Sequence, residues 1–252
     1  MNGHRRAQSI VRAFRPRIGR SDVVVTGFGS FPGVPRNATA DIVRELAALG
    51  GFALRVVSHR SRDFAVGRGA LALPSGREAR ASLMILPVAW DAAGALVEKE
   101  ARATRARLVV MCGVAAPSQP IFVEADATSA RVAKVDALGV RPRRARSMAV
   151  TRAATLEVEL ARGAIDRALT AEPVASVPGV LVTRARPDNA YVCNATAYAV
   201  ATARLRAAHG FLHWPKDISR EDVPACARVL GAMIDVLLAA RGASRDPLRR
   251  AP

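Results

Sequence analysis

Short apolar segments alternate with alanine-rich segments of helical character along most of this chain, and this alternation constrains the fold more than any other feature. Apolar runs typical of buried strands lie at residues 23–25, 52–59, 83–88, 108–112, 179–183 and 210–214. Helical composition or spacing marks residues from about 37 or 39 to 50, 90–104, 155–169, 195–207 and 220–240. Because the connections are short, we predict an α/β fold in three layers, α/β/α, with a twisted, mostly parallel (mixed) sheet flanked by helices.

The length and composition fit one domain. The chain has 252 residues, of which 50% are hydrophobic, and this is ample for one large core. We expect a basic, disordered tail at residues 1–21, an α/β domain at 22–241 and a basic tail at 242–252. Residues 1–20 hold arginines and no acidic residue, with weak helical spacing at Ile10, Val11 and Phe14. A membrane-surface helix or a targeting-like segment is the alternative for this tail.

The net charge of +17 is carried almost entirely by arginine. The arginines are dispersed and lack the interleaved aromatic residues that stacking on bases requires, so we expect no specific nucleic-acid partner. No apolar run reaches the length of a membrane-spanning helix, and the N-terminus lacks the apolar core of a secretory signal. We therefore expect a protein without a membrane partner.

The cysteines indicate a reducing compartment. Cys112, Cys193 and Cys226 lie far apart, without paired spacing and without a metal-ligand pattern. Neither a disulfide framework nor a metal site is indicated, and a cytoplasmic location fits best.

Cys193 stands where a turn-rich segment passes into an alanine-rich helix. In the first turn of that helix, unpaired N–H groups and the positive end of the helix dipole would stabilise a thiolate. The alternative is that Cys193 is simply buried, as free cysteines usually are.

A base and an acid for this thiol come from two other apolar segments. His213 ends a short strand that Pro215 stops, and a histidine at a strand end can reach a neighbouring helix N-terminus. Glu124 closes the apolar segment 120–124 and is the best candidate to orient the imidazole, because a thiol nucleophile needs both partners. Taken alone, Glu124 would be an ordinary surface charge at a strand end.

A glycine-rich loop follows the first strand, at residues 26–35. Its glycines fit neither the dinucleotide spacing nor the Walker spacing, so we do not predict a phosphate site there. The loop does carry two aromatic residues, Phe28 and Phe31, with Asn37 beyond it.

Three separated blocks of the chain resemble the pyroglutamyl peptidases, also called pyrrolidone carboxyl peptidases, a family of cysteine peptidases. The blocks are V-V-V-T-G-F-G-S-F at residues 23–31 with Asn37, L-V-V-M-C-G at 108–113 with Glu124, and Y-V-C-N at 191–194 with G-F-L-H at 210–213. The resemblance spans about residues 22–240.

The resemblance implies the activity and the site. It implies removal of an N-terminal pyroglutamyl residue from peptides, with Cys193 as nucleophile, His213 as general base and Glu124 as the residue that orients it, and with no cofactor. It also implies a binding pocket built with Phe28, Phe31, Asn37 and Val192, although core packing is the alternative for the two phenylalanines. The family is often oligomeric, so a homo-oligomer is an expectation too.

Three segments depart from the family pattern. Val114 replaces a glutamine after the central strand, Ser30, Pro32 and Gly33 replace residues around Phe31, and Arg131 and Lys134 compete for the place of an arginine after Glu124. A relative with an altered substrate, or one that lost activity and binds other molecules, nucleic acid included, is therefore the alternative function.

Overall fold

The computed structural model describes residues 3–58, 61–142, 149–152, 157–184 and 190–243. The helices are α1 Gly3–Ala13, α2 Ala38–Leu49, α3 Ala93–Ala103, α4 Val158–Ala171, α5 Val192–Thr202 and α6 Val223–Ala243. The strands are β1 Val23–Phe28, β2 Arg55–Ser58, β3 Ser61–Ala72, β4 Glu78–Leu86, β5 Leu108–Val114, β6 Ile121–Glu124, β7 Asp126–Thr128, β8 Val150–Arg152, β9 Val180–Thr183 and β10 Ala208–Trp214.

Eight strands form one mixed sheet in the order β2-β3-β4-β1-β5-β10-β6-β9. Strands β4, β1, β5 and β10 are mutually parallel, whereas β6 runs antiparallel to β10 and β9 runs parallel to β6. Strands β7 and β8 form a separate antiparallel ribbon. The predicted mostly parallel, mixed α/β sheet is confirmed.

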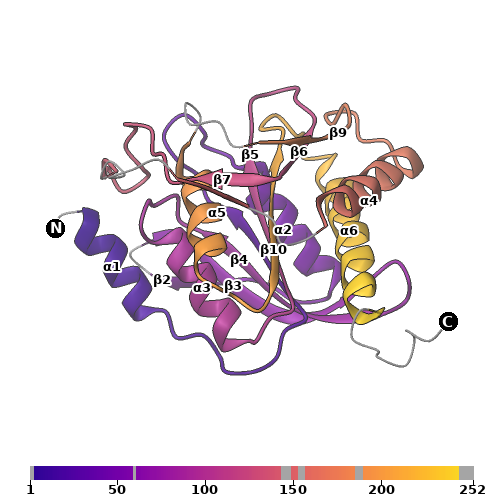
Figure 1. Cartoon of the computed structure of the whole chain (residues 1–252), viewed down its shortest axis with the longest axis horizontal. Helices are drawn as coiled ribbons and strands as arrows, with labels where there is room; N and C mark the ends of the chain where they lie inside the picture. Colours follow the sequence, from indigo (N-terminus) through magenta and orange to yellow (C-terminus); the bar gives the residue numbers. More distant parts are fainter. Residues whose placement is uncertain (1–2, 59–60, 143–148, 153–156, 185–189, 244–252) are drawn as a thin grey trace.

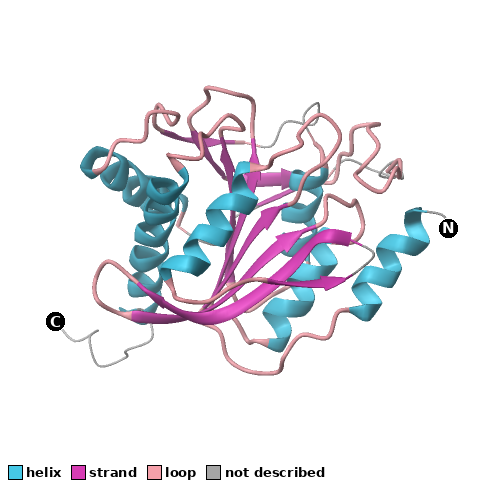
Figure 2. Cartoon of the chain, turned by 180° about the vertical axis from the view of Figure 1, so that it is seen from behind, coloured by secondary structure: helices cyan, strands magenta, loops and turns pink. Residues whose placement is uncertain are grey.

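Helices cover both faces of the sheet (Figures 1 and 2), and strand residues alternate between two cores. Val23 and Val25 point to the core shared with α2, α4 and α6, while Val24 points to the core shared with α1, α3 and α5. Strands β1 and β5 are buried along almost their whole length, which explains why they read as continuous apolar runs. The three-layer α/β/α arrangement follows from this double burial.

The N-terminal segment corrects the expected disordered tail. Helix α1 buries Ala7 and Ile10, and Phe14 directly after it is buried as well; all three residues are at most 4% exposed. Phe14 packs edge-on against Phe64 with ring centroids 5.1 Å apart, and Lys99 Nζ donates to the Phe14 carbonyl at 2.6 Å. The apolar residues with helical spacing therefore form the buried face of α1. Packing of this face against the rest of the fold supplies the stability that the segment lacks alone.

Two stretches without a strand prediction form strands. Strands β3 and β4 make a long hairpin, of which only residues 83–86 fall within a predicted strand, 83–88, while residues 61–82 carry no strand prediction. Glycine in β3 weakens the strand pattern of the sequence. A Cβ on Gly69 would lie 2.2 Å from the ring of Phe52, so only glycine leaves space for that ring against the strand. The basic, proline-containing composition of segment 141–152 predicts a surface loop, but the segment contains β8, and its residues 143–148 lie outside the described part.

Helix α6 packs against α2 and α4 on one face of the sheet. The segment Val223–Gly242 of α6 is long and apolar enough to cross a membrane. However, 61% of its most apolar 18-residue stretch is buried inside the fold. Core helices of soluble proteins pass the same test. The expected C-terminal tail, residues 242–252, falls almost wholly outside the described residues.

Candidate active site

The carboxyl ends of β5 and β10, the end of β6 and the first turn of α5 meet at one edge of the sheet. Gly113 of β5 lies opposite His213 of β10, and Phe211, two residues before His213, lies opposite Glu124 of β6. Because β10 is hydrogen-bonded to both β5 and β6, groups that are distant in sequence become neighbours. Ligand sites of open α/β sheets form at such strand ends.

His213 and Glu124 form a short hydrogen bond. The distance between His213 Nδ1 and Glu124 Oε1 is 2.7 Å, and the two side chains are 18% and 13% exposed. With Nδ1 as the donor, Nε2 is left for another partner. Burial alone would lower the pKa of His213, but hydrogen bonds to Cys193 and Glu124 and the charges of both groups raise it to about 10.

Cys193 is the second residue of α5, half-buried and close enough to His213 to raise the pKa of the imidazole. The first backbone hydrogen bond at this helix end runs from Ala195 N to Tyr191 O, so the preceding N–H groups face outward from the helix end. The other two cysteines differ: Cys112 and Cys226 are fully buried, and burial raises the pKa of each thiol to about 12. Cys193 is thus the thiol whose surroundings favour reaction.

Gly113 makes room for the sulfur of Cys193. A Cβ built on Gly113 would lie 2.8 Å from Cys193 Sγ and 3.0 Å from the Phe211 ring. The Phe211 ring in turn lies 4.8 Å from the His213 ring, between centroids. Neither Gly113 nor Phe211 was predicted as a site residue, although both belong to the motifs M-C-G and G-F-L-H.

An aromatic cluster stands next to the nucleophilic turn. The Tyr191 ring lies 5.8 Å from Phe31 and 5.1 Å from Trp90, the latter edge-on. The Tyr191 hydroxyl donates to the Val135 carbonyl at 2.8 Å, which fixes the ring. The structure thus brings Phe31 close to the turn that carries Cys193, together with two aromatic residues that sequence reasoning missed.

The other predicted binding residues are packed into the fold. Phe28 is 1% exposed and Val192 is fully buried, both in the core beneath α3 and α5. Asn37 caps α2, accepting from Thr39 N at 3.2 Å and donating to the Gly29 carbonyl at 3.1 Å. In this structure Asn37 shapes the loop between β1 and α2, and any contact of these three side chains with a substrate stays a prediction.

The two candidates for the missing arginine lie beside the aromatic cluster. Arg131 Nη1 donates to Asp91 at 3.0 Å, and its guanidinium lies 5.9 Å from the Trp90 ring centroid. The Lys134 carbonyl accepts from the Trp90 indole at 3.2 Å, and the Lys134 side chain is exposed. Arg131 is therefore the better anchored of the two cations, through Asp91 and Trp90.

Asn194, the residue after Cys193, fastens the ribbon of β7 and β8 to α5. Its amide oxygen accepts from Thr128 N at 2.9 Å, and its amide nitrogen donates to the Thr128 carbonyl at 2.7 Å. Glu124 is only two residues before β7, so this clamp also fixes the chain that carries the carboxylate. The Y-V-C-N motif contained Asn194, but nothing in the sequence showed its partner.

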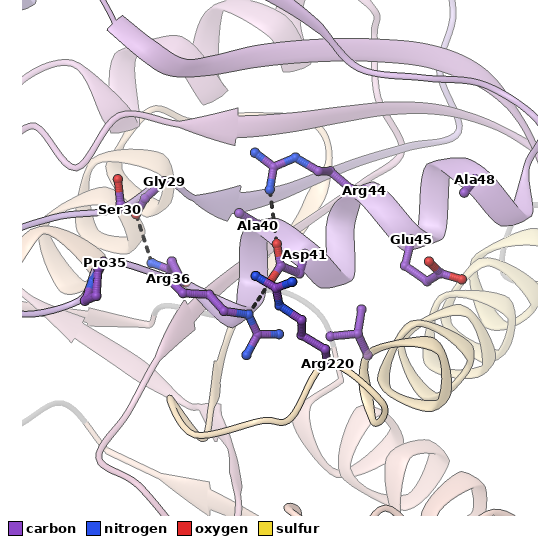
Figure 3. A pocket seen from close by; sticks show the side chains of 12 residues that line it. Gly29, Ser30, Pro35, Arg36, Ala40, Asp41, Arg44, Glu45, Ala48 and Arg220 are labelled. Carbon is purple, nitrogen blue, oxygen red and sulfur yellow. Dashed lines mark hydrogen bonds and ion pairs between the residues drawn. The ribbon is translucent and has the colours of Figure 1, made fainter.

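A cavity of about 610 Å³ lies beside this edge, over α2 (Figure 3). Its lining includes Gly29, Ser30 and Asn37 of the loop after β1 but none of Cys193, His213 and Glu124. Asp41 is paired there with Arg36 at 2.6 Å and with Arg44 at 3.2 Å. Within the described residues, no group of three side chains suited to hold a metal ion occurs.

Comparison with solved structures defines the class of fold: it is that of pyroglutamyl peptidase I. Pyroglutamyl peptidase I of Bacillus amyloliquefaciens superposes with a TM-score of 0.61 at 17% identity, covering 87% of this chain and 98% of the other. Pyrrolidone carboxyl peptidase of Thermococcus litoralis gives 0.61 at 18% identity, covering 92% and 99%. A mutant of the Pyrococcus furiosus pyrrolidone carboxyl peptidase gives 0.58 at 18% identity, covering 86% and 98%. No family model matches the chain, and no curated protein matches it significantly in sequence.

Proposed function

We propose that this protein is a cysteine exopeptidase that removes an N-terminal pyroglutamyl residue from peptides. The observation that carries the proposal is the chain of contacts from Glu124 through His213 to Cys193, at the N-terminus of α5. The fold shared with pyroglutamyl peptidase I structures supports the choice of substrate class.

The reaction begins with transfer of the Cys193 proton to His213 Nε2. The raised pKa of His213 favours an imidazolium beside a thiolate, since each charge stabilises the other. The thiolate attacks the carbonyl carbon between the pyroglutamyl ring and the next residue. His213 then gives its proton to the leaving amine, which departs as the shortened peptide and leaves a thioester on Cys193.

Water completes the cycle. His213 accepts a proton from the water that attacks the thioester, and free pyroglutamate leaves as the C–S bond breaks. Glu124 holds the Nδ1–H so that Nε2 faces the sulfur throughout, and it stabilises the imidazolium. The free N–H groups of the first turn of α5, that of Cys193 included, are the donors for the oxyanion.

Phe31, Trp90 and Tyr191 form an aromatic wall beside this turn, suited to a flat lactam ring. The half-buried Val114 ends β5 opposite Trp214, in the place of the family's glutamine. The wall therefore supplies apolar contact, and backbone groups must supply the directed hydrogen bonds that a glutamine would have made. A reducing compartment such as the cytoplasm would keep the Cys193 thiol free.

The test is hydrolysis of pyroglutamyl aminomethylcoumarin, with alanyl and prolyl coumarins as controls for specificity. We expect wild type to hydrolyse the pyroglutamyl substrate and Cys193→Ala to lose at least roughly 10³-fold in kcat/KM. Cys226→Ala, which removes a buried thiol on α6, is the matched control and should keep its activity. Hydrolysis that survives in Cys193→Ala, or its absence in a folded wild type, refutes the proposal; thiol-dependent hydrolysis of another acyl amide alone would keep the chemistry and reject the substrate.

A further inference from the structure

A second cavity, of about 540 Å³, is lined by six arginines and will be called the arginine cavity. The six are Arg20, Arg102, Arg105, Arg107, Arg204 and Arg206. It lies at the amino ends of β5 and β10, whereas Gly113 and His213 lie near their carboxyl ends. Since both strands have seven residues, roughly 20 Å separates the arginine cavity from the catalytic edge.

Two turns of the same design build most of the arginine cavity. Helices α3 and α5 lie side by side on one face of the sheet (Figure 1), and each is followed by an Arg-x-Arg segment that leads into β5 or β10. Arg105 and Arg204 occupy equivalent places, just after the helix C-caps, with φ of 48° and 52°. Glycine is the usual residue there, so two arginines in the left-handed conformation are conspicuous.

Backbone hydrogen bonds join these turns to a third segment. Gly19 N and Ser21 N donate to the Ala103 and Thr104 carbonyls, which holds Arg20 against the end of α3. Ala208 N donates to the Arg107 carbonyl at 3.0 Å and joins the two turns. The arginines are thus presented by a connected backbone.

Most of this positive charge is uncompensated. Arg102 is paired with Glu98 at 2.8 Å, and Arg107 lies 3.7 Å from Asp22. The remaining four, Arg20, Arg105, Arg204 and Arg206, are exposed and have no side-chain partner among the described residues, and the described lining contains no acidic side chain. A helix C-terminus favours one cation near it, but two helix ends do not account for four unpaired guanidinium groups.

We propose that the arginine cavity binds a compact anion that carries several phosphate groups. Guanidinium forks match phosphate oxygens in pairs, and four unpaired forks from three segments suit a ligand with several such groups. The volume falls in the range of small-molecule sites. No aromatic side chain belongs to the described lining, so stacking of bases from single-stranded nucleic acid has no platform there.

Isothermal titration calorimetry with inorganic tripolyphosphate, at about 0.15 M salt so that weak surface attraction is screened, tests the proposal. The variant is Arg105→Gly/Arg204→Gly, which removes two of the unpaired charges where glycine suits the backbone and folding should be kept. The matched control is Arg55→Ala/Arg167→Ala, which removes two exposed arginines elsewhere, on β2 and α4. We expect wild type to bind, the variant to bind at least tenfold more weakly, and the control to stay within twofold.

Titrations with ATP and adenosine show which kind of polyphosphate the arginine cavity binds. Binding of ATP as tight as that of tripolyphosphate, with adenosine inactive, indicates a nucleoside triphosphate, while weaker ATP binding indicates an inorganic polyphosphate. Three results overturn the proposal: no tripolyphosphate binding by wild type, equal losses in variant and control, or binding of a single-stranded oligonucleotide without binding of tripolyphosphate. Hydrolysis that depends on Cys193 should be the same in all these proteins, so the two proposals fail independently.

Discussion

Adding one methyl group at Gly113 should disable the thiol of Cys193. An alanine Cβ there would stand 2.8 Å from Cys193 Sγ and 3.0 Å from two Phe211 ring atoms. Carbon atoms in favourable contact lie about 3.5–4.0 Å apart, so the sulfur must retreat by roughly 0.7 Å or more. Phe211 is 1% exposed and its ring lies against His213, so it has little room to yield.

A displacement of about 1 Å at a reacting atom costs on the order of 10²-fold in rate. We therefore expect Gly113→Ala to lower both the alkylation rate of Cys193 by iodoacetamide and kcat/KM by roughly 10- to 100-fold. Overpacking should also lower the free energy of unfolding by about 1–3 kcal/mol. Alkylation at pH 7, followed by mass spectrometry of the Cys193 peptide, measures the first effect and urea unfolding the second.

A double-mutant cycle isolates the contact with sulfur. In a Cys193→Ala background the clash with Sγ is gone and only the Phe211 contact remains, so Gly113→Ala should destabilise that protein less. Wild-type alkylation and stability in Gly113→Ala would refute the reasoning, because they would mean that the sulfur does not rest against this glycine.

Three other predictions follow, two for the candidate site and one for the packing of α6. Glu124→Gln should lower kcat/KM by roughly 10²- to 10⁴-fold in the coumarin assay while leaving the fold intact by circular dichroism, because the imidazolium of His213 loses its carboxylate; near-wild-type turnover would exclude an orienting role. The pKa of His213 is raised to about 10, above its ordinary value near 6.5, so its protonation stabilises the fold fully below that ordinary value and this contribution is lost as pH rises toward 10. Urea unfolding at pH 7 and 9.5 should show that decline in wild type and a smaller one in Glu124→Gln, and equal slopes would contradict it. Asp235→Ala on α6 should lower the free energy of unfolding by about 1–3 kcal/mol in urea, since this buried carboxylate accepts from Ser75 N at 2.7 Å and pairs with Arg77. The control Asp166→Ala, on the exposed face of α4, should change the free energy of unfolding by less than about 0.5 kcal/mol.

The central part of the fold was predictable because its strands are buried on both faces. Residues 23–25 and 108–112 carry unbroken apolar runs, residues 210–214 carry one interrupted by His213, and each lies in a central strand. Strand β3 was not predictable in the same way, since Gly67 and Gly69 weaken the strand pattern. Their role appears only in the fold, where the Ala53 backbone packs against Gly67 and the Phe52 ring against Gly69.

Helix ends were less predictable than strands. The helix after the turn at residue 190 was expected at 195–207 and lies at Val192–Thr202, so Cys193 is inside the first turn as predicted but the helix stops earlier. It stops because Arg204 takes a left-handed conformation, which no propensity of arginine indicates.

The residues of the candidate site were also only partly predictable from the sequence. Cys193, His213 and Glu124 could be selected from their places at strand and helix ends, whereas Trp90, Gly113 and Asn194 gain their meaning only from three-dimensional contacts. Phe28, expected in the loop after the first strand, is instead the last residue of β1 and packs in the core, so a role for it in substrate binding stays a prediction.

Strand β10 lies between β5 and β6 although it follows both in the chain. During synthesis, β5 and β6 therefore each have an unpaired edge until β10 is made. Direct pairing of these two edges is a misfolding route that the nascent chain must avoid. The same late insertion delivers the imidazole, while the thiol arrives on the helix just ahead of it. The Cys193 thiol would thus become reactive only when β10 has completed the sheet. Its alkylation rate would then report on folding.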